Sequence, residues 1–403
     1  MLPESQKQNR IDISEKKPQV NNFYLVISGR FKTAKYITLC VLVIFLLTMV
    51  VLCRDEITVE NLRYLFKDFE MGENVVVNTD SSITYDSDPQ VNLALYKGDL
   101  VISGSTNFTL CDLQGNNRLS EDSLFSNPVI LTGDKYILVY GLSENTYAMY
   151  NTFSKLHTES FDYPIIAAAL SDEGMYAIVT RTTEYRSVIY IYNKNFERVG
   201  AIYKDKYIVD IEFNSDGTKL LIASTYSSNG NYCTELVNYT PYSNEASKTQ
   251  IIENSMPIKV AYNKNGGYSI VCDNCIYFYD SEYNHKSTFD FGTKILPLSI
   301  EMTNEHTTIT YSENIVGEDI RVLVFDENGS TVVNASASGI AKKTRTTKDY
   351  VYVLQNGSVC RINNQDGSAV YYDTEKNALE MLLVNDSLIV VGFTDHVSKL
   401  TIQ

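Results

Sequence analysis

A unit of short apolar segments recurs along this chain at intervals of about forty residues. Each unit opens with an apolar run that leads into a polar turn, and the eight runs start at Val91, Pro128, Pro164, Tyr207, Pro257, Pro297, Gly339 and Ala378. These starts are separated by 37, 36, 43, 50, 40, 42 and 39 residues. Four strands in about forty residues leave no room for crossover helices. The pattern therefore predicts an all-β protein, and its period is typical of four-stranded β-propeller blades.

The repeat predicts eight blades, with seven as the alternative because the first and seventh units are poorly patterned. The last unit, Ala378 to Gln403, contains only three apolar segments. The apolar segment NVVVN, Asn74 to Asn78, is expected to supply its fourth strand. Pairing the two ends of the chain in this way would close the ring and remove its open sheet edges.

An uncharged run of eighteen residues, Tyr36 to Cys53, precedes the repeats. At 1.5 Å per residue such a helix spans about 27 Å, close to the hydrocarbon thickness of a bilayer. The preceding tail has seven Lys and Arg residues and three acidic ones. This balance of +4 predicts a cytoplasmic N-terminus. A cleavage site for a signal peptide is not visible, so we interpret the run as an uncleaved signal anchor in the cell membrane.

The segment after the apolar run has helical spacing, with Leu62, Leu65, Phe66 and Phe69 on one face. Its acidic residues favour docking on the following domain over lying on a membrane surface. The predicted organisation is therefore a basic, disordered cytoplasmic tail (1–35), a transmembrane helix (36–53), a short juxtamembrane amphipathic helix or linker (54–73) and an extracytoplasmic β-propeller (74–403).

The part of the chain after the apolar run is strongly acidic. It contains 27 Lys and Arg residues against 46 Asp and Glu residues, a formal charge of −19. Nucleic-acid binders instead show a basic surface, so a nucleic-acid partner is excluded. We interpret most of this acidity as a solvated surface.

The segment FNSDGTKLL, from Phe213 to Leu221, resembles the F-S-P-D-G-x-x-L turn of WD40-like and TolB-like β-propellers. In this turn Asp216 and Gly217 would join the first two strands of a blade. The whole layout, with NLRYL at Asn61 to Leu65, resembles an uncharacterised bacterial family of single-pass membrane proteins with a propeller ectodomain. The resemblance implies a fold and a location but no reaction.

Sequence motifs for catalysis, cofactors or metals are not visible. Sialidase and quinone-dependent propellers depend on Trp, and this chain has none. Cys272 and Cys275 have the spacing of half a zinc site, but a second pair is missing, so they are expected to flank a hairpin turn and could be bridged to each other. The sequence therefore predicts no catalytic, cofactor-binding or metal-binding residue.

Two functions remain. The first is a non-enzymatic binding or scaffolding module for a protein or cell-envelope partner, held in the lipid bilayer by its single helix. The alternative is an extracytoplasmic hydrolase or lyase whose carboxylates come from separate blades. Acidic residues clustered around the central channel below a pocket would favour the enzyme, whereas an open, Tyr-rich face would favour the binding module.

Overall fold

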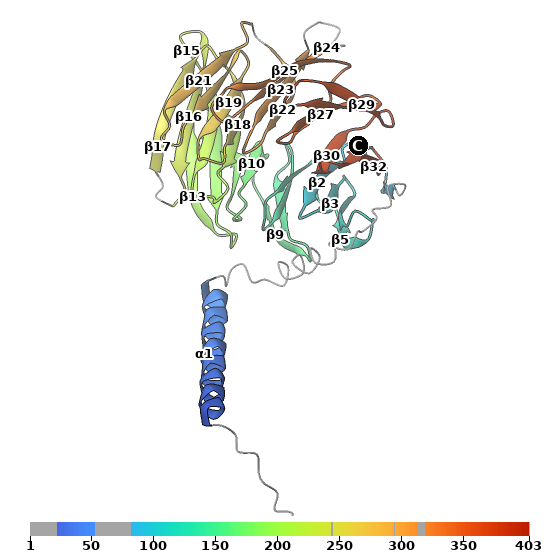
Figure 1. Ribbon diagram of the computed structural model, residues 1–403. Helices are drawn as coiled ribbons and strands as arrows, with labels where there is room; N and C mark the ends of the chain where they lie inside the picture. Colours follow the sequence, from blue (N-terminus) through green and yellow to red (C-terminus); the bar gives the residue numbers. More distant parts are fainter. Residues whose placement is uncertain (1–21, 53–81, 243–244, 294, 313–318, 403) are drawn as a thin grey trace, which may run out of the picture. The chain divides into compact units, whose positions relative to one another are not determined.

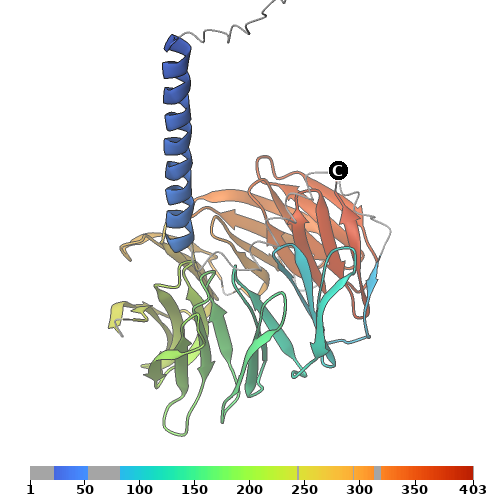
Figure 2. The same ribbon diagram turned by 90° about the horizontal axis from the view of Figure 1, so that it is seen from below.

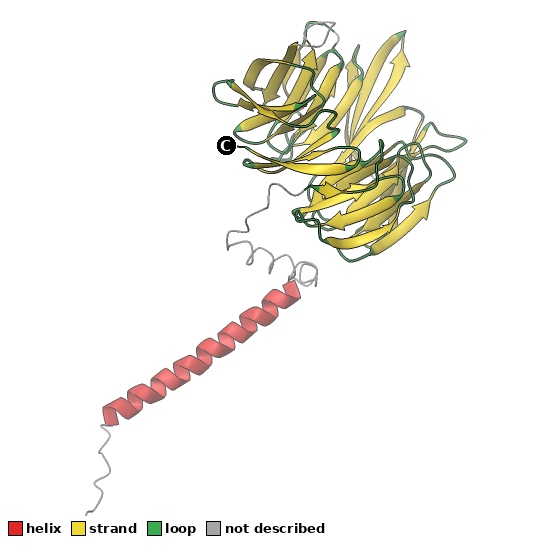
Figure 3. Ribbon diagram, turned by 90° about the vertical axis from the view of Figure 1, so that its right-hand side faces the viewer, coloured by secondary structure: helices red, strands yellow, loops and turns green. Residues whose placement is uncertain are grey.

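The computed structural model describes residues 22–52, 82–242, 245–293, 295–312 and 319–402. It separates into two compact units, residues 1–74 and 75–403, which are described one at a time. The expected juxtamembrane helix, 54–73, and the expected closing segment, 74–78, lie outside the described residues. Figure 3 shows the second unit as strands and loops, with the helix confined to the first.

The described part of the first unit is a single helix, α1 (Asn22–Leu52). Within it, Gly29–Thr48 is long and apolar enough to cross a membrane, with a mean hydropathy of 1.7 and exposed side chains. The helix begins well before the expected start at Tyr36, so the prediction of a disordered tail is wrong for residues 22–35. The physical reason is that Arg and Lys in this stretch are good helix formers, and the nearest preceding Pro that could stop the helix is Pro18.

The second unit is an eight-bladed β-propeller, as the repeat predicted, and the seven-bladed alternative is excluded. Its strands form eight antiparallel four-stranded sheets that follow one another around a ring (Figure 1). The first strands of the sheets contact one another and form the inside of the ring. These first strands are β2 (Asn92–Tyr96), β6 (Pro128–Thr132), β10 (Ala167–Leu170), β14 (Tyr207–Phe213), β18 (Pro257–Tyr262), β22 (Pro297–Met302), β26 (Lys343–Thr346) and β30 (Glu380–Asn385).

The second and third strands form the middle of each blade. The second strands are β3 (Asp99–Ser103), β7 (Ile137–Gly141), β11 (Tyr176–Thr180), β15 (Leu220–Ser228), β19 (Tyr268–Cys272), β23 (Thr307–Ser312), β27 (Tyr350–Gln355) and β31 (Leu388–Gly392). The third strands are β4 (Asn107–Cys111), β8 (Thr146–Tyr150), β12 (Ser187–Tyr192), β16 (Asn231–Thr240), β20 (Cys275–Tyr279), β24 (Asp319–Phe325), β28 (Ser358–Asn363) and β32 (His396–Thr401).

The fourth strands form the outer rim and are mostly exposed. They are β5 (Asn117–Asp122), β9 (Lys155–Ser160), β13 (Arg198–Lys204), β17 (Glu245–Glu253), β21 (His285–Asp290), β25 (Thr331–Ser338), β29 (Ala369–Asp373) and, for the last blade, β1 (Ile83–Thr84). On β25 exposed and buried residues alternate, as expected for a strand with one solvated face.

The core lies between neighbouring blades. Each pair of adjacent sheets, including the last with the first, encloses a buried apolar cluster. Because the second strands are covered on both faces, their sequences are continuous apolar runs: β7, β11, β19 and β31 are buried at every position. This packing explains why the repeat was visible in the sequence.

The ring is closed by a strand from the N-terminal side of the propeller, as predicted, but by a different segment. β1 pairs with β32 through Ile83↔Val397 and Thr84↔His396. In the described residues the fourth strand of the last sheet is Ile83–Thr84, whereas the segment expected there, Asn74–Asn78, lies outside the described part of the chain. The Tyr85 hydroxyl strengthens the closure by donating to the Phe393 carbonyl, with an O–O distance of 2.5 Å. Figure 2 shows the first and last blades side by side.

The antiparallel order gives the ring two distinct faces. The connections from first to second strands, and from third to fourth, lie on one face, which we name the turn face. The other connections lie on the opposite face.

Candidate acidic pocket on the turn face

A pocket of about 580 Å³ opens on the turn face, near the inner strands. Its walls come from the turns between the first and second strands of five consecutive blades, beginning with the blade of β6 and ending with that of β22. These walls contain residues 134, 170–173, 212–216, 261–264 with 266, and 302–304. The pocket is therefore built by the repeated turn that carries the resemblance to WD40-like propellers.

The turn between β14 and β15 has the geometry that its sequence predicts. Gly217 has a φ of 70°, which lies in the left-handed region that favours glycine. The backbone N–H and the hydroxyl of Thr218 both donate to Asp216, over 2.9 and 2.6 Å. Burial alone would raise the pKa of Asp216, but these hydrogen bonds outweigh it and lower that pKa.

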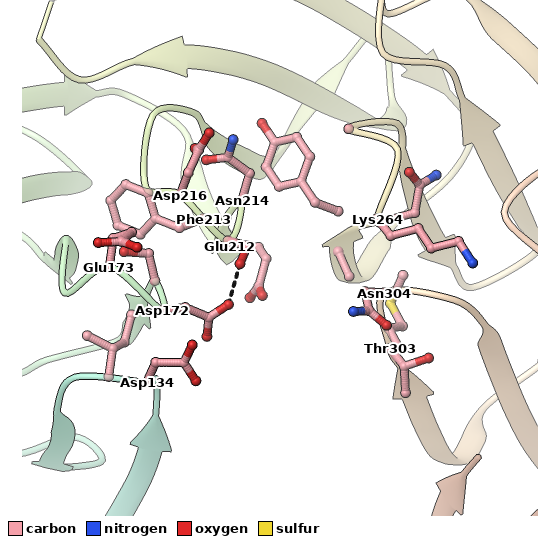
Figure 4. Close-up of a pocket in the computed structure, with 18 residues that line it drawn as sticks. Asp134, Asp172, Glu173, Glu212, Phe213, Asn214, Asp216, Lys264, Thr303 and Asn304 are labelled. Carbon is pink, nitrogen blue, oxygen red and sulfur yellow. Dashed lines mark hydrogen bonds between the residues drawn. The ribbon is translucent and has the colours of Figure 1, made fainter. Parts of the chain in front are cut away.

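Five acidic residues and one lysine line the pocket: Asp134, Asp172, Glu173, Glu212, Asp216 and Lys264. Figure 4 shows the carboxylates gathered on one side, while Lys264 extends away from them on the other. The ammonium group of Lys264 pairs with Glu305 over 2.9 Å. The pocket therefore has a negative potential that its own lysine does not neutralise.

Most of these carboxylates have partners within the protein. Asp172 accepts a hydrogen bond from the Ser215 hydroxyl. Glu173 forms an ion pair with Lys135 over 2.7 Å. Together with the bonds of Asp216, these contacts fix the positions of the carboxylates in the acidic rim.

Glu212 differs from the acidic residues of the rim. It lies on β14, two residues from Asp210, so both side chains are on the same face of the innermost strand. Burial among the inner strands raises the pKa of Glu212 to about 8, with a further contribution from the negative charge of Asp210. Burial also raises the pKa of Asp210 to about 6, although the Val260 N–H donates to this carboxylate over 2.9 Å.

Elsewhere along the inner strands, acidic residues have cationic partners. Arg345 on β26 pairs with Glu301 on β22 and with Glu380 on β30, each over 2.9 Å. Lys343 also pairs with Glu380, over 3.0 Å. Among the described residues Glu212 has no such pair, so the inner wall is neutralised near β26 and remains acidic near β14.

The cysteine pair does not contribute to the pocket. Cys272 and Cys275 end β19 and begin β20, so they flank a hairpin turn as predicted. Both are buried free thiols, and the suggested bridge between them is not formed. Within the described ranges, no three His, Cys, Asp or Glu side chains stand close enough together to hold a metal ion.

Sequence reasoning named no site residues and missed this pocket. Two signals were available. Asp134, Asp172 and Asp216 occur in the same turn of three consecutive units, and the apolar first strand of the fourth unit is interrupted by Asp210 and Glu212. Stacking the units by their turns would have placed these acids on one face of one ring.

Residues 73–399 match the model of a family of unknown function, DUF5711. The chain belongs to this family. The matched range begins before β1 and ends within β32, so it includes strands of all eight blades. No curated protein matches the sequence significantly.

Several solved propellers are similar to this chain in fold. The computationally designed Ika8 protein has a TM-score of 0.59 at 12% identity, covering 79% of this chain and 98% of its own. BamB from Moraxella catarrhalis has a TM-score of 0.55 at 11% identity, with coverages of 81% and 99%. Chaetomium thermophilum Sqt1, bound to the N-terminus of ribosomal protein L10, has a TM-score of 0.57 at 12% identity, with coverages of 79% and 98%. At such identities the similarity concerns the fold alone.

Proposed function

We propose that this protein is an extracytoplasmic binding or scaffolding module, anchored in the cell membrane by α1, which engages a protein partner through the acidic pocket. The observation that carries the proposal is the pocket itself, because turns from five blades converge on one hollow lined by five acidic residues and a single lysine. A partner with a basic segment would be attracted to this charge and oriented by it. The Sqt1 structure supports the idea that a propeller of this kind can hold a segment of another protein.

The pocket also has a feature in favour of the alternative function, an extracytoplasmic hydrolase or lyase. Carboxylates from separate blades converge here, and the raised pKa of Glu212 suits a general acid. A hydrolase of this type needs a second carboxylate as base or nucleophile. Asp172 and Asp216 are already bound to hydroxyl groups, and Glu173 is bound to Lys135. Because these three carboxylates are held by hydrogen bonds or an ion pair, they are less available as a base or nucleophile, which favours binding over catalysis.

A photo-crosslinking residue placed in living cells tests the binding function. At Asn304, an exposed residue of the pocket wall, it should give a discrete adduct with a protein partner. At Ser228, exposed on the opposite face, it should give none. The Asp172→Asn variant should weaken the adduct at Asn304. Equal labelling from both positions would contradict a pocket-specific partner.

The enzyme is tested directly with the purified full chain. We expect no turnover of glycan or peptide substrates. Turnover that is abolished by Glu212→Gln would replace the binding function with the hydrolase.

A further inference from the structure

Glu212 is an acidic residue of the pocket without a partner of its own. Its side chain lines the pocket from the innermost strand, together with Asp172 of the preceding blade and Tyr262 at the end of β18. Among the described residues it makes no hydrogen bond and no ion pair, whereas Asp172, Glu173 and Asp216 each have at least one. Figure 4 shows Glu212 facing into the pocket with Lys264 directed elsewhere.

An enclosed carboxylate without a partner is costly in its charged form. The negative charges of Asp210 and Asp172 increase this cost, and the positive charge of Lys259 only partly offsets it. A cation entering the pocket would supply the missing partner. The pocket is large enough for a long side chain, and its volume lies within the range of ligand sites.

We propose that the pocket holds one basic side chain of the partner protein, a lysine ammonium or an arginine guanidinium group, against the carboxylate of Glu212. This inference rests on the proposed binding function and names the group that is recognised. Asp172 and Asp216 would surround the charge from the rim, and the tyrosine ring of Tyr262 would border its aliphatic stem.

Binding of such a cation should be linked to pH. The pKa of Glu212 is raised to about 8 in the free protein, so this group is mainly protonated at neutral pH. A cation beside it favours the ionised form, and binding below about pH 8 therefore releases a proton. The other groups that act on Glu212 are Asp210, Asp172 and Lys259. Asp210 has a pKa of about 6. Its ionisation as pH rises through about 6 therefore also increases the affinity for the cation.

The inference is tested with the full chain in detergent and two dye-labelled pentapeptides, Gly-Gly-Lys-Gly-Gly and its norleucine counterpart. Fluorescence anisotropy at low salt should show the lysine peptide binding about tenfold more tightly or better. Affinity for this peptide should rise from about pH 6 to about pH 8 and then level off. Glu212→Gln should abolish both the preference and its pH dependence.

The matched control is Glu282→Gln, which removes an exposed carboxylate from another turn on the same face, outside the pocket. This variant should bind both peptides like the unmodified chain. Equal binding of the two peptides, or loss of the preference in both variants, would overturn the inference. A Glu212→Gln variant that keeps the preference would also overturn it.

The inference and the proposed function fail in different ways. If the crosslink at Asn304 forms but the lysine peptide shows no preference, the pocket binds a partner by other groups and only the inference is wrong. If no crosslink forms at Asn304, the binding function is wrong. Calcium titration gives a further outcome: calcium that binds only when Glu212 is present, with no effect of the lysine peptide, would identify a metal ion as the ligand.

Discussion

Gly217 is constrained both by its backbone and by its neighbours. A Cβ at this position would lie 2.6 Å from Cγ of Met175 and 2.9 Å from Oγ of Ser171. Gly217→Ala should lower the free energy of unfolding for two reasons: the positive φ is strained for Ala, and the new methyl group collides with Met175. We expect the collision to add about 1–3 kcal/mol to the cost of the strained φ. Gly230→Ala is the matched control, because Gly230 has a φ of 83° and open space around it. If Gly217→Ala and Gly230→Ala lower the melting temperature by the same amount, the contact with Met175 is unimportant.

Glu212 also determines how stability depends on pH. Its pKa is raised from 4.5 to about 8 by burial, so the folded chain holds this proton more tightly than the unfolded chain. Stability is therefore expected to fall as pH rises through this interval, by about 1.4 kcal/mol for each pKa unit. Glu212→Gln should melt at a higher temperature than the unmodified chain at about pH 8 and should flatten this decline. If the melting temperatures of Glu212→Gln and of the unmodified chain change with pH in the same way from about pH 5 to about pH 9, the raised pKa of Glu212 is contradicted.

The short strand β1 closes the ring, and its two residues differ in exposure. Ile83 packs with the cluster between the last and first blades, whereas Thr84 is exposed. Ile83→Asp should therefore destabilise the propeller by about 1.5–3 kcal/mol, since it removes apolar burial. Thr84→Asp places the same charge on the same strand and should cost much less. Similar melting temperatures for the two variants would show that the closure does not depend on this contact.

The whole chain has a predicted orientation in the membrane, based on its basic tail and on a helix that is apolar enough to span a bilayer. A reporter that is active only outside the cytoplasm should work when fused after Gln403. A cytoplasmic reporter at the same position should be inactive. The opposite result would reverse the topology and place the acidic pocket in the cytoplasm.

The repeat could be predicted from the sequence because each blade is packed on both faces. Burial on both faces requires continuous apolar runs such as YAIVT on β11, and the turns between them require polar residues and glycine. Four of the eight first strands begin at the predicted residue: Pro128, Tyr207, Pro257 and Pro297. The others begin one to four residues later, because strand ends depend on hydrogen-bond partners in the sheet.

The closure and the pocket were decided by tertiary structure. NVVVN and Ile83–Thr84 are both short segments that could pair with β32, and nothing local in the sequence distinguishes them. The pairing of Ile83 with Val397 and of Thr84 with His396 identifies the strand that is used. Glu212 likewise looks like one polar residue in an apolar strand. Its pKa is raised mainly by burial among the inner strands, with smaller contributions from nearby negative charges such as that of Asp172, which only the assembled ring brings close to it. Local sequence determines which segments become strands, because burial and turn geometry act over a few residues, whereas electrostatic interactions depend on distances that exist only after the blades have assembled.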